Sequence, residues 1–295
     1  AKGLFNKVIG QSGSVAFAEV VKPPEIQIAS VKALATLTGC ESENTDEVLD
    51  CLRTKPYMDL VKPAPLKEDD PPPILMWTPI SGDSFFPKHP MELLEDEDTH
   101  KQLKGIKFIF GVNDIEAYML TKADLFMRTF SSEKTLTNLK NDVQMLLMMF
   151  LHTPPPSEDN KAMYDGIIDA LLDHYLKVSD PTEEDLIVTA ARIGGGILLQ
   201  APPIRTANKF REIGADVKFY VLNKGPSHFM NFRPSFIETD HGDDLFFCFG
   251  LSHTINSEPM FSNVTWNEED IRMEDLFVNY WLNFAKTGDP NGPNL

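Results

Sequence analysis

The sequence predicts an α/β fold with a mainly parallel sheet, because strand patterns alternate with helical patterns along its 295 residues. Three short apolar runs predict strands, at residues 7–9, 106–110 and 218–222. Apolar residues at helical spacing occupy much of the chain between the last two strands and after them. Alternation of this kind favours parallel pairing, since a helix returns the chain to the starting edge of the sheet.

The connections and helices follow from local signals. The first strand runs into a turn at residues 10–14, glycine at 111 ends the second strand, and proline-rich residues 62–73 predict an exposed connection. The last helix is expected to start near Asn267, where acidic residues follow, and to stop at Gly288. Two apolar helical stripes support this pattern: Met163, Ile167, Ala170 and Leu171, and then Leu276, Phe277, Tyr280, Trp281 and Phe284.

Composition excludes several classes of protein. Hydrophobic residues make up 42% and charged residues 24%, which is typical of a globular protein with a sizeable core. The formal net charge of −17 argues against binding to nucleic acid, which is itself a polyanion. No run approaches the roughly 18 uninterrupted apolar residues of a membrane span. The first residues show neither an initiator Met nor a signal-peptide pattern, and the last follow a turn, so we expect truncation at both ends.

The cysteines and one sequon suggest a compartment. Cys40 and Cys51 flank a polar stretch and could close a short disulfide loop, which would imply an oxidising environment. Cys248 lies between two phenylalanines, so we expect a buried, reduced side chain. Asn263 begins an Asn-Val-Thr glycosylation sequon, which is consistent with a secretory route.

A histidine flanked by carboxylates is the first candidate for chemistry. His241 is followed by Gly242 and lies between Asp240 and Asp243, just before an apolar run. One interpretation is a general base on a loop, with the glycine allowing a tight turn or an approaching substrate. The alternatives are a solvated turn with an incidental histidine and a metal site, for which one histidine among carboxylates is a poor ligand set.

A second candidate follows the strand at residues 106–110. Acids of hydrolytic triads lie on loops just past strand ends, and Glu116 is the candidate, while Asp114 would suit a helix cap. Glu116 precedes His241 by 125 residues, in the order acid then histidine that follows a serine in one class of triads.

No Gly-x-Ser-x-Gly motif occurs before Glu116. The nearest sequence surrounds Ser12, where serine replaces the final glycine, so a strand end packed under the site is favoured over a nucleophile. The glycines at residues 194–196 could suggest an oxyanion loop, but they come after the acid and lack a preceding histidine, which favours close helix packing.

Several motifs together resemble the carboxylesterase/cholinesterase family. They lie in the family's order from one end of the chain to the other: KGLF and VIGQSG at residues 2–5 and 8–13, Cys40 to Cys51 with Leu-Arg after it, ISGD and FPKHP at 80–83 and 86–90, GVNDIE at 111–116, DHGDDL at 240–245, and NYW through FAKTGDPN at 279–291. The FPKHP and DHGDDL motifs resemble those of carboxylesterases more than those of acetylcholinesterases.

The resemblance implies that residues 1–295 are the C-terminal part of one α/β-hydrolase domain, with a mostly parallel sheet flanked by helices. It further implies a serine carboxylesterase of the secretory pathway, either secreted or in the endoplasmic reticulum lumen, that acts on small carboxylic esters without a cofactor. Glu116 would orient His241, and Cys40 and Cys51 would form a family disulfide. The nucleophilic serine, about 20 residues before Ala1 by family spacing, and the oxyanion loop would both lie upstream.

A non-catalytic relative is the alternative. Neuroligin-like adhesion proteins resemble the same family and keep the fold without the serine, and such relatives can retain the histidine. The residue at the upstream elbow distinguishes the two hypotheses.

Overall fold

The computed structural model describes residues 3–17, 21–22, 24–61, 78–119, 135–150, 153–228, 233–251 and 266–292. The chain divides into two compact units. One comprises Ala1–Phe17 together with Glu95–Leu295, and the other comprises Ala18–Leu94. The predicted connection at residues 62–73 and the sequon at Asn263 lie outside the described residues.

The described part of the larger unit contains a three-stranded sheet in the order β1-β2-β3, with β1 at Lys7–Gln11, β2 at Lys107–Asn113 and β3 at Asp216–Leu222. Both neighbouring pairs run parallel. The predicted parallel α/β arrangement is therefore confirmed, with each strand longer than its apolar pattern suggested.

The helices that the structure describes in this unit are α5 (Glu97–Leu103), α7 (Leu136–Phe150), α8 (Lys161–Tyr175), α9 (Glu183–Gly195), the π-helical turn η1 (Gly196–Gln200), α10 (Ala201–Glu212), α11 (Asp243–Cys248) and α13 (Glu268–Thr287).

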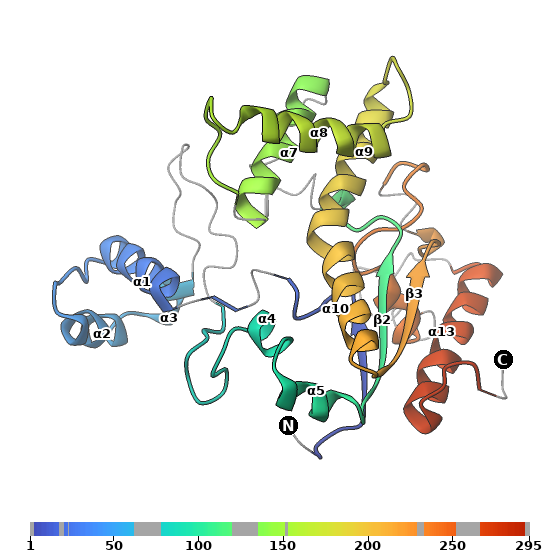
Figure 1. Ribbon diagram of the computed structural model, residues 1–295, viewed down its shortest axis with the longest axis horizontal. Coiled ribbons are helices and arrows are strands. Elements are labelled where there is room, and N and C mark those ends of the chain that lie inside the picture. The colour runs from blue at the N-terminus through green and yellow to red at the C-terminus, as the bar shows by residue number, and fades with distance from the viewer. Residues whose placement is uncertain are drawn as a thin grey trace. The chain divides into compact units, whose positions relative to one another are not determined.

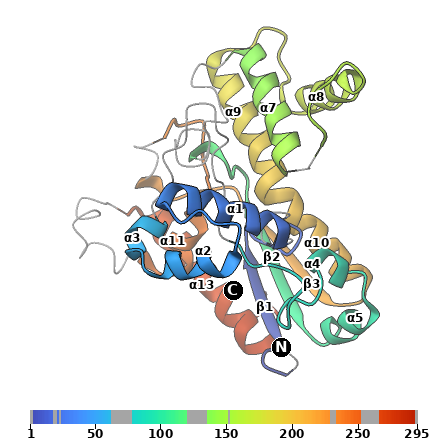
Figure 2. The same cartoon turned by 90° about the vertical axis from the view of Figure 1, so that its left-hand side faces the viewer.

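Helices cover both faces of this sheet (Figures 1 and 2). On one face Phe108 and Phe110 of β2, two residues apart and therefore on the same side, meet Phe210 of α10 at ring-centroid distances of 4.7 and 5.7 Å. On the other face the ring of Tyr220 in β3 lies 5.7 Å from that of Phe277 in α13. The sheet is thus the middle layer of this unit.

Gly111 does not end its strand, contrary to the prediction. It lies inside β2, and the ring of Tyr220 from the neighbouring strand lies directly over it. A Cβ at Gly111 would stand 1.8 Å from Cε1 of that ring. The glycine is therefore required by the close approach of an aromatic side chain rather than by a turn, and a single sequence does not reveal which of the two applies.

A long helical run joins α9, η1 and α10. Among the residues with described structure, Glu183–Glu212 is the one helix long and apolar enough to cross a membrane by length and composition, a test that core helices of soluble proteins also pass. Here α10 packs on β2 and β3, and α9 packs on α7 and α8 (Figure 1). These contacts bury part of its apolar surface, including Leu186, Ile193 and Leu198.

The last helix has the predicted ends. Asn267 caps α13 with a reciprocal capping box to Asp270, and Gly288 terminates it with φ of 78° in the left-handed region. Local signals sufficed here because both caps bond to their own helix.

The smaller unit is helical in its described part. It contains α1 (Pro24–Thr38), α2 (Thr45–Arg53), α3 (Tyr57–Val61) and α4 (Pro90–Leu93). Leu34, Val48 and Leu52 form a small buried cluster between α1 and α2. His89 caps α4, and its other ring nitrogen lies 3.1 Å from the carbonyl oxygen of Val21.

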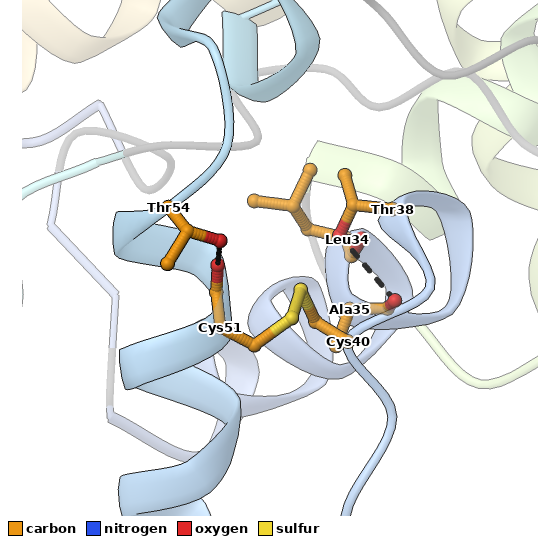
Figure 3. Close-up of a disulfide and its surroundings, with 6 residues drawn as sticks. All are labelled: Leu34, Ala35, Thr38, Cys40, Cys51 and Thr54. Carbon is orange, nitrogen blue, oxygen red and sulfur yellow. Dashed lines mark hydrogen bonds between the residues drawn. A yellow bond between two sulfur atoms is a disulfide. The ribbon is translucent and has the colours of Figure 1, made fainter.

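The predicted disulfide is present (Figure 3). Cys40 and Cys51 are bonded, with Cα atoms 5.5 Å apart, and the bond joins α2 to the segment after α1. The backbone N–H of Cys40 also donates to the carbonyl of Ala35 at 2.8 Å, which continues the end of α1. Cys248 is free as expected, although its side chain is half-buried rather than buried.

We predict that removing this disulfide destabilises the smaller unit. Because the bond closes a loop of 11 residues, the Cys40→Ala/Cys51→Ala double variant should lose about 3 kcal/mol of unfolding free energy, mainly by freeing the unfolded chain. Denaturant unfolding of both forms measures the loss, and Cys248→Ala is the control, with little expected change. Non-reducing peptide mapping that links Cys248 to another cysteine would contradict the assignment.

We also predict that the sheet does not tolerate a side chain at Gly111. Gly111→Ala forces a methyl group into the Tyr220 ring and should cost at least about 2 kcal/mol of unfolding free energy. Gly166→Ala in α8 is the matched control. A Cβ there meets nothing within 4 Å, so the substitution should stabilise the protein by about 0.5–1 kcal/mol. Equal thermal shifts for the two variants would contradict the packing described here.

Candidate active site

The segments that follow β1, β2 and β3 meet at one edge of the sheet. Parallel strands present their carboxyl ends at the same edge, so residues far apart in sequence converge there. Ser12 comes directly after β1, Glu116 lies on the loop after β2, and His241 lies on the segment that leads from β3 to α11.

Glu116 and His241 are in contact. Oε2 of Glu116 lies 2.8 Å from Nδ1 of His241, the hydrogen bond that the triad hypothesis requires. The Glu116 side chain is fully buried, whereas that of His241 is 45% exposed. With Nδ1 engaged by the carboxylate, Nε2 is the ring nitrogen left to exchange a proton with a substrate or nucleophile.

Two further groups stabilise the buried Glu116 carboxylate. Its Oε1 accepts a hydrogen bond from the backbone N–H of Asn113 at 2.6 Å and another from the hydroxyl of Ser12 at 2.5 Å. A buried carboxylate without hydrogen-bond donors would be costly, so these groups are what allow an acid to sit here. Ser12 adopts φ of 50°, a left-handed conformation uncommon for serine, and its hydroxyl is directed at Glu116.

This geometry does not support Ser12 as a nucleophile. Its hydroxyl is buried and donates to the acid rather than to the histidine. The favoured interpretation of a strand end under the site describes its position, but the direct bond to Glu116 was not expected. The positive φ that aims this hydroxyl is invisible in the sequence.

The environment favours the charged form of the histidine. The hydrogen bond to Glu116 raises the pKa of His241 above its ordinary value of 6.5, against the opposing effect of burial, and the charges of Glu116, Asp244 and Asp240 raise it further. The site can therefore accept a proton on His241 and hold the resulting imidazolium against a fixed carboxylate, which is what a general base needs.

A buried ion pair and a backbone hydrogen bond stabilise the turn that carries His241. Gly242 adopts φ of 87°, so the chain turns sharply there before α11 begins. Asp243 forms a buried ion pair with Arg233, with Nη2 and Oδ2 2.6 Å apart, and the same Oδ2 accepts from the backbone N–H of Asp240. Burial raises the pKa of Asp243 to about 6, despite the opposing effect of Arg233.

A second polar network lies beside the pair. Oδ2 of Asp244 accepts hydrogen bonds from the side chains of Gln11 at 2.7 Å and Tyr220 at 3.2 Å. Gln11 in turn accepts one from the indole N–H of Trp281 at 3.3 Å. Burial and the charge of Asp244 raise the pKa of Tyr220, so its phenol stays protonated as a donor. These bonds link β1 and β3 to α11 and α13.

The remaining candidates have structural positions. The carboxylate of Asp114, which the sequence suggested for a helix cap, pairs with Arg192 of α9 at 2.8 Å. Two of the three glycines at 194–196 are closely packed, as favoured from the sequence: a Cβ at Gly195 would lie 3.1 Å from the Cβ of Glu116, and one at Gly196 would lie 3.3 Å from the hydroxyl of Tyr175. Within the described ranges, histidine, cysteine and carboxylate side chains form no group of three or more that could hold a metal ion.

Comparison with known proteins agrees with the motifs. The model of the carboxylesterase family matches residues 1–295. Similar proteins include carboxylesterase 5A of Felis catus, 29% identical over all of this chain and 49% of its own length. The medium-chain fatty acyl-CoA hydrolase precursor of Anas platyrhynchos is 27% identical over all of this chain and 48% of its own length. The acylcarnitine hydrolase of Rattus norvegicus is 26% identical, again over all of this chain, and 47% of it is covered.

The parallel sheet flanked by helices is part of an α/β-hydrolase fold. The chain belongs to the carboxylesterase family. It spans about half the length of the curated relatives it matches.

We predict that the Glu116 charge sets the pKa of His241. Glu116→Gln should lower that pKa, because the imidazolium loses its carboxylate partner. Since the raised pKa stabilises the folded state below pH 6.5 and this contribution is lost as the pH rises through the folded value, the variant should lose more stability in acid than in base. NMR titration of the His241 ring measures the pKa. An unchanged value would contradict the pairing.

Proposed function

We propose that the whole protein is a serine carboxylesterase to which this chain contributes the acid and the base of the triad. The observation that carries the proposal is the 2.8 Å bond between Glu116 and His241 at the carboxyl edge of a parallel sheet in a carboxylesterase-family chain. Since the chain spans about half the length of its relatives, the nucleophilic serine and the oxyanion donors are assigned to the part of the protein beyond this sequence.

In the proposed mechanism, Nε2 of His241 removes the proton from the serine hydroxyl as its oxygen attacks the ester carbonyl. The imidazolium then gives that proton to the leaving alcohol, and the acyl group stays on the serine. Water, deprotonated by the same nitrogen, releases the carboxylic acid and restores the serine. Throughout, Glu116 fixes the ring orientation through Nδ1 and stabilises the imidazolium, without itself taking the proton.

The proposed substrates are small carboxylic esters. Relatives carry names for hydrolysis of fatty acyl-CoA and of acylcarnitine, both acyl compounds that the same acyl-enzyme chemistry cleaves. A solvent-exposed histidine above a buried acid suits this reaction, because the base must reach a substrate while its partner stays fixed. The mechanism needs no cofactor.

We further propose that residues 1–295 form part of one hydrolase domain, with the disulfide-containing unit Ala18–Leu94 lying between β1 and β2 in the chain. The Cys40–Cys51 bond supports an oxidising compartment, either secretion or the lumen of the endoplasmic reticulum. Glycosylation at Asn263 belongs to the same proposal, and a mature protein with reduced Cys40 and unmodified Asn263 would contradict it.

The proposal is tested by measuring ester hydrolysis and organophosphate labelling of the whole protein. The protein should hydrolyse aryl esters and be inactivated by an organophosphate that labels one serine outside residues 1–295. His241→Ala should lower kcat by about 10⁴-fold or more, because the serine loses its base. Glu116→Gln should cost as much or less, since the ring keeps its place but loses charge stabilisation. Asp169→Asn on the exposed surface of α8 is the control, with kcat unchanged.

Three outcomes would contradict the proposal or its residue assignment. Activity that survives His241→Ala nearly intact would mean that the reaction does not pass through this pair. A protein with no esterase activity and no labelled serine would instead place this chain with the non-catalytic adhesion relatives, in which the fold persists without the chemistry. If the organophosphate labels Ser12, the nucleophile lies within residues 1–295, and the assignment of the serine to the rest of the protein is wrong.

A further inference from the structure

Asp240, the residue before His241, holds the loop that carries Glu116. Its Oδ1 accepts the backbone N–H of Tyr118 at 3.0 Å, and its Oδ2 accepts that of Met119 at 2.7 Å. Its backbone carbonyl accepts the side-chain amide of Asn113 at 3.0 Å. Glu116 lies between Asn113 and Tyr118 in the chain, so Asp240 holds the loop on both sides of the acid by hydrogen bonds.

The preceding residue adds a fourth bond. The hydroxyl oxygen of Thr239 accepts the backbone N–H of Ile115 at 3.0 Å, one residue before the acid. The side chains of Thr239 and Asp240 are both almost completely buried. Four hydrogen bonds from two adjacent residues therefore set how far the acid's loop lies from the turn that begins at His241.

The Asp240 carboxylate is placed for this role rather than for chemistry. Its oxygens face backbone N–H groups, including that of His241, whereas the imidazole bonds to Glu116. A neutral acceptor could supply some of these bonds. The Asp240 carboxylate also places a negative charge next to the imidazole, together with those of Glu116 and Asp244. Burial raises the pKa of Asp240, while its backbone N–H donors and the charge of Arg233 act in the opposite direction and favour the ionised carboxylate.

We infer that Asp240 is a positioning residue of the site, one that fixes the Glu116–His241 distance and favours the imidazolium through its buried charge. The inference rests on the proposed function for its kinetic consequence, and on geometry alone for its effect on His241. A shift of about 1 Å between acid and base is enough to lower turnover about 100-fold, which is why the loop needs rigid anchors.

Asp240→Asn in the whole protein is the test. The variant keeps the size of the side chain, removes its charge and turns one acceptor into a donor that faces an N–H group. We expect kcat to fall about 100-fold with little change in KM, and NMR titration to show a lower pKa for His241. Asp114→Asn is the matched control on the same loop. Its exposed carboxylate bonds to Arg192, so kcat should stay within about twofold.

Thr239→Val decides the matter if Asp240→Asn does not fold. It preserves shape and removes the acceptor for Ile115, and a drop in kcat of about tenfold is expected. Folded variants whose kcat and His241 pKa match the parent would overturn the inference. If His241→Ala leaves turnover intact, the proposed function fails instead, and the His241 pKa of Asp240→Asn still tests the positioning role on its own.

Discussion

The buried carboxylate of Glu116 is the constraint on which the site depends. An ionised acid removed from water needs donors on each oxygen, and here Asn113, Ser12 and His241 supply them. Each donor comes from a different position at the sheet edge. The three strands must therefore end where their donors come within hydrogen-bond distance of the carboxylate. The same requirement accounts for the left-handed conformation of Ser12, which aims its hydroxyl at the acid.

Parallel pairing makes this convergence possible. Because β1, β2 and β3 share one direction, their following loops come together although they are separated by about a hundred residues each. Closing such loops is entropically expensive, and the aromatic contacts of Phe110 and Tyr220 on opposite faces hold the strands and their covering helices in place. The chemistry at the edge thus rests on packing in the middle of the sheet.

The two loops also stabilise one another. The acid lies on a segment whose backbone donors are satisfied by Thr239 and Asp240, and the base lies directly after those residues. The buried pair of Arg233 and Asp243 then supports the turn. Removing one partner of such a pair costs more than the pair itself contributes, because the other charge is left buried, so this part of the site is a unit rather than a set of independent contacts.

Local chemistry in the sequence determined the strands, the caps of α13 and, through family motifs, the candidate pair of Glu116 and His241. These signals depend on neighbouring residues or on residue type, so they can be recognised in the sequence without knowledge of the tertiary structure. The sequence did not show that Gly111 lies inside a strand, because the ring that requires it comes from residue 220. Nor did it show that Ser12 bonds to the acid or that Asp114 pairs with a helix. Each of those choices depends on which distant side chain stands opposite, and only tertiary packing decides that.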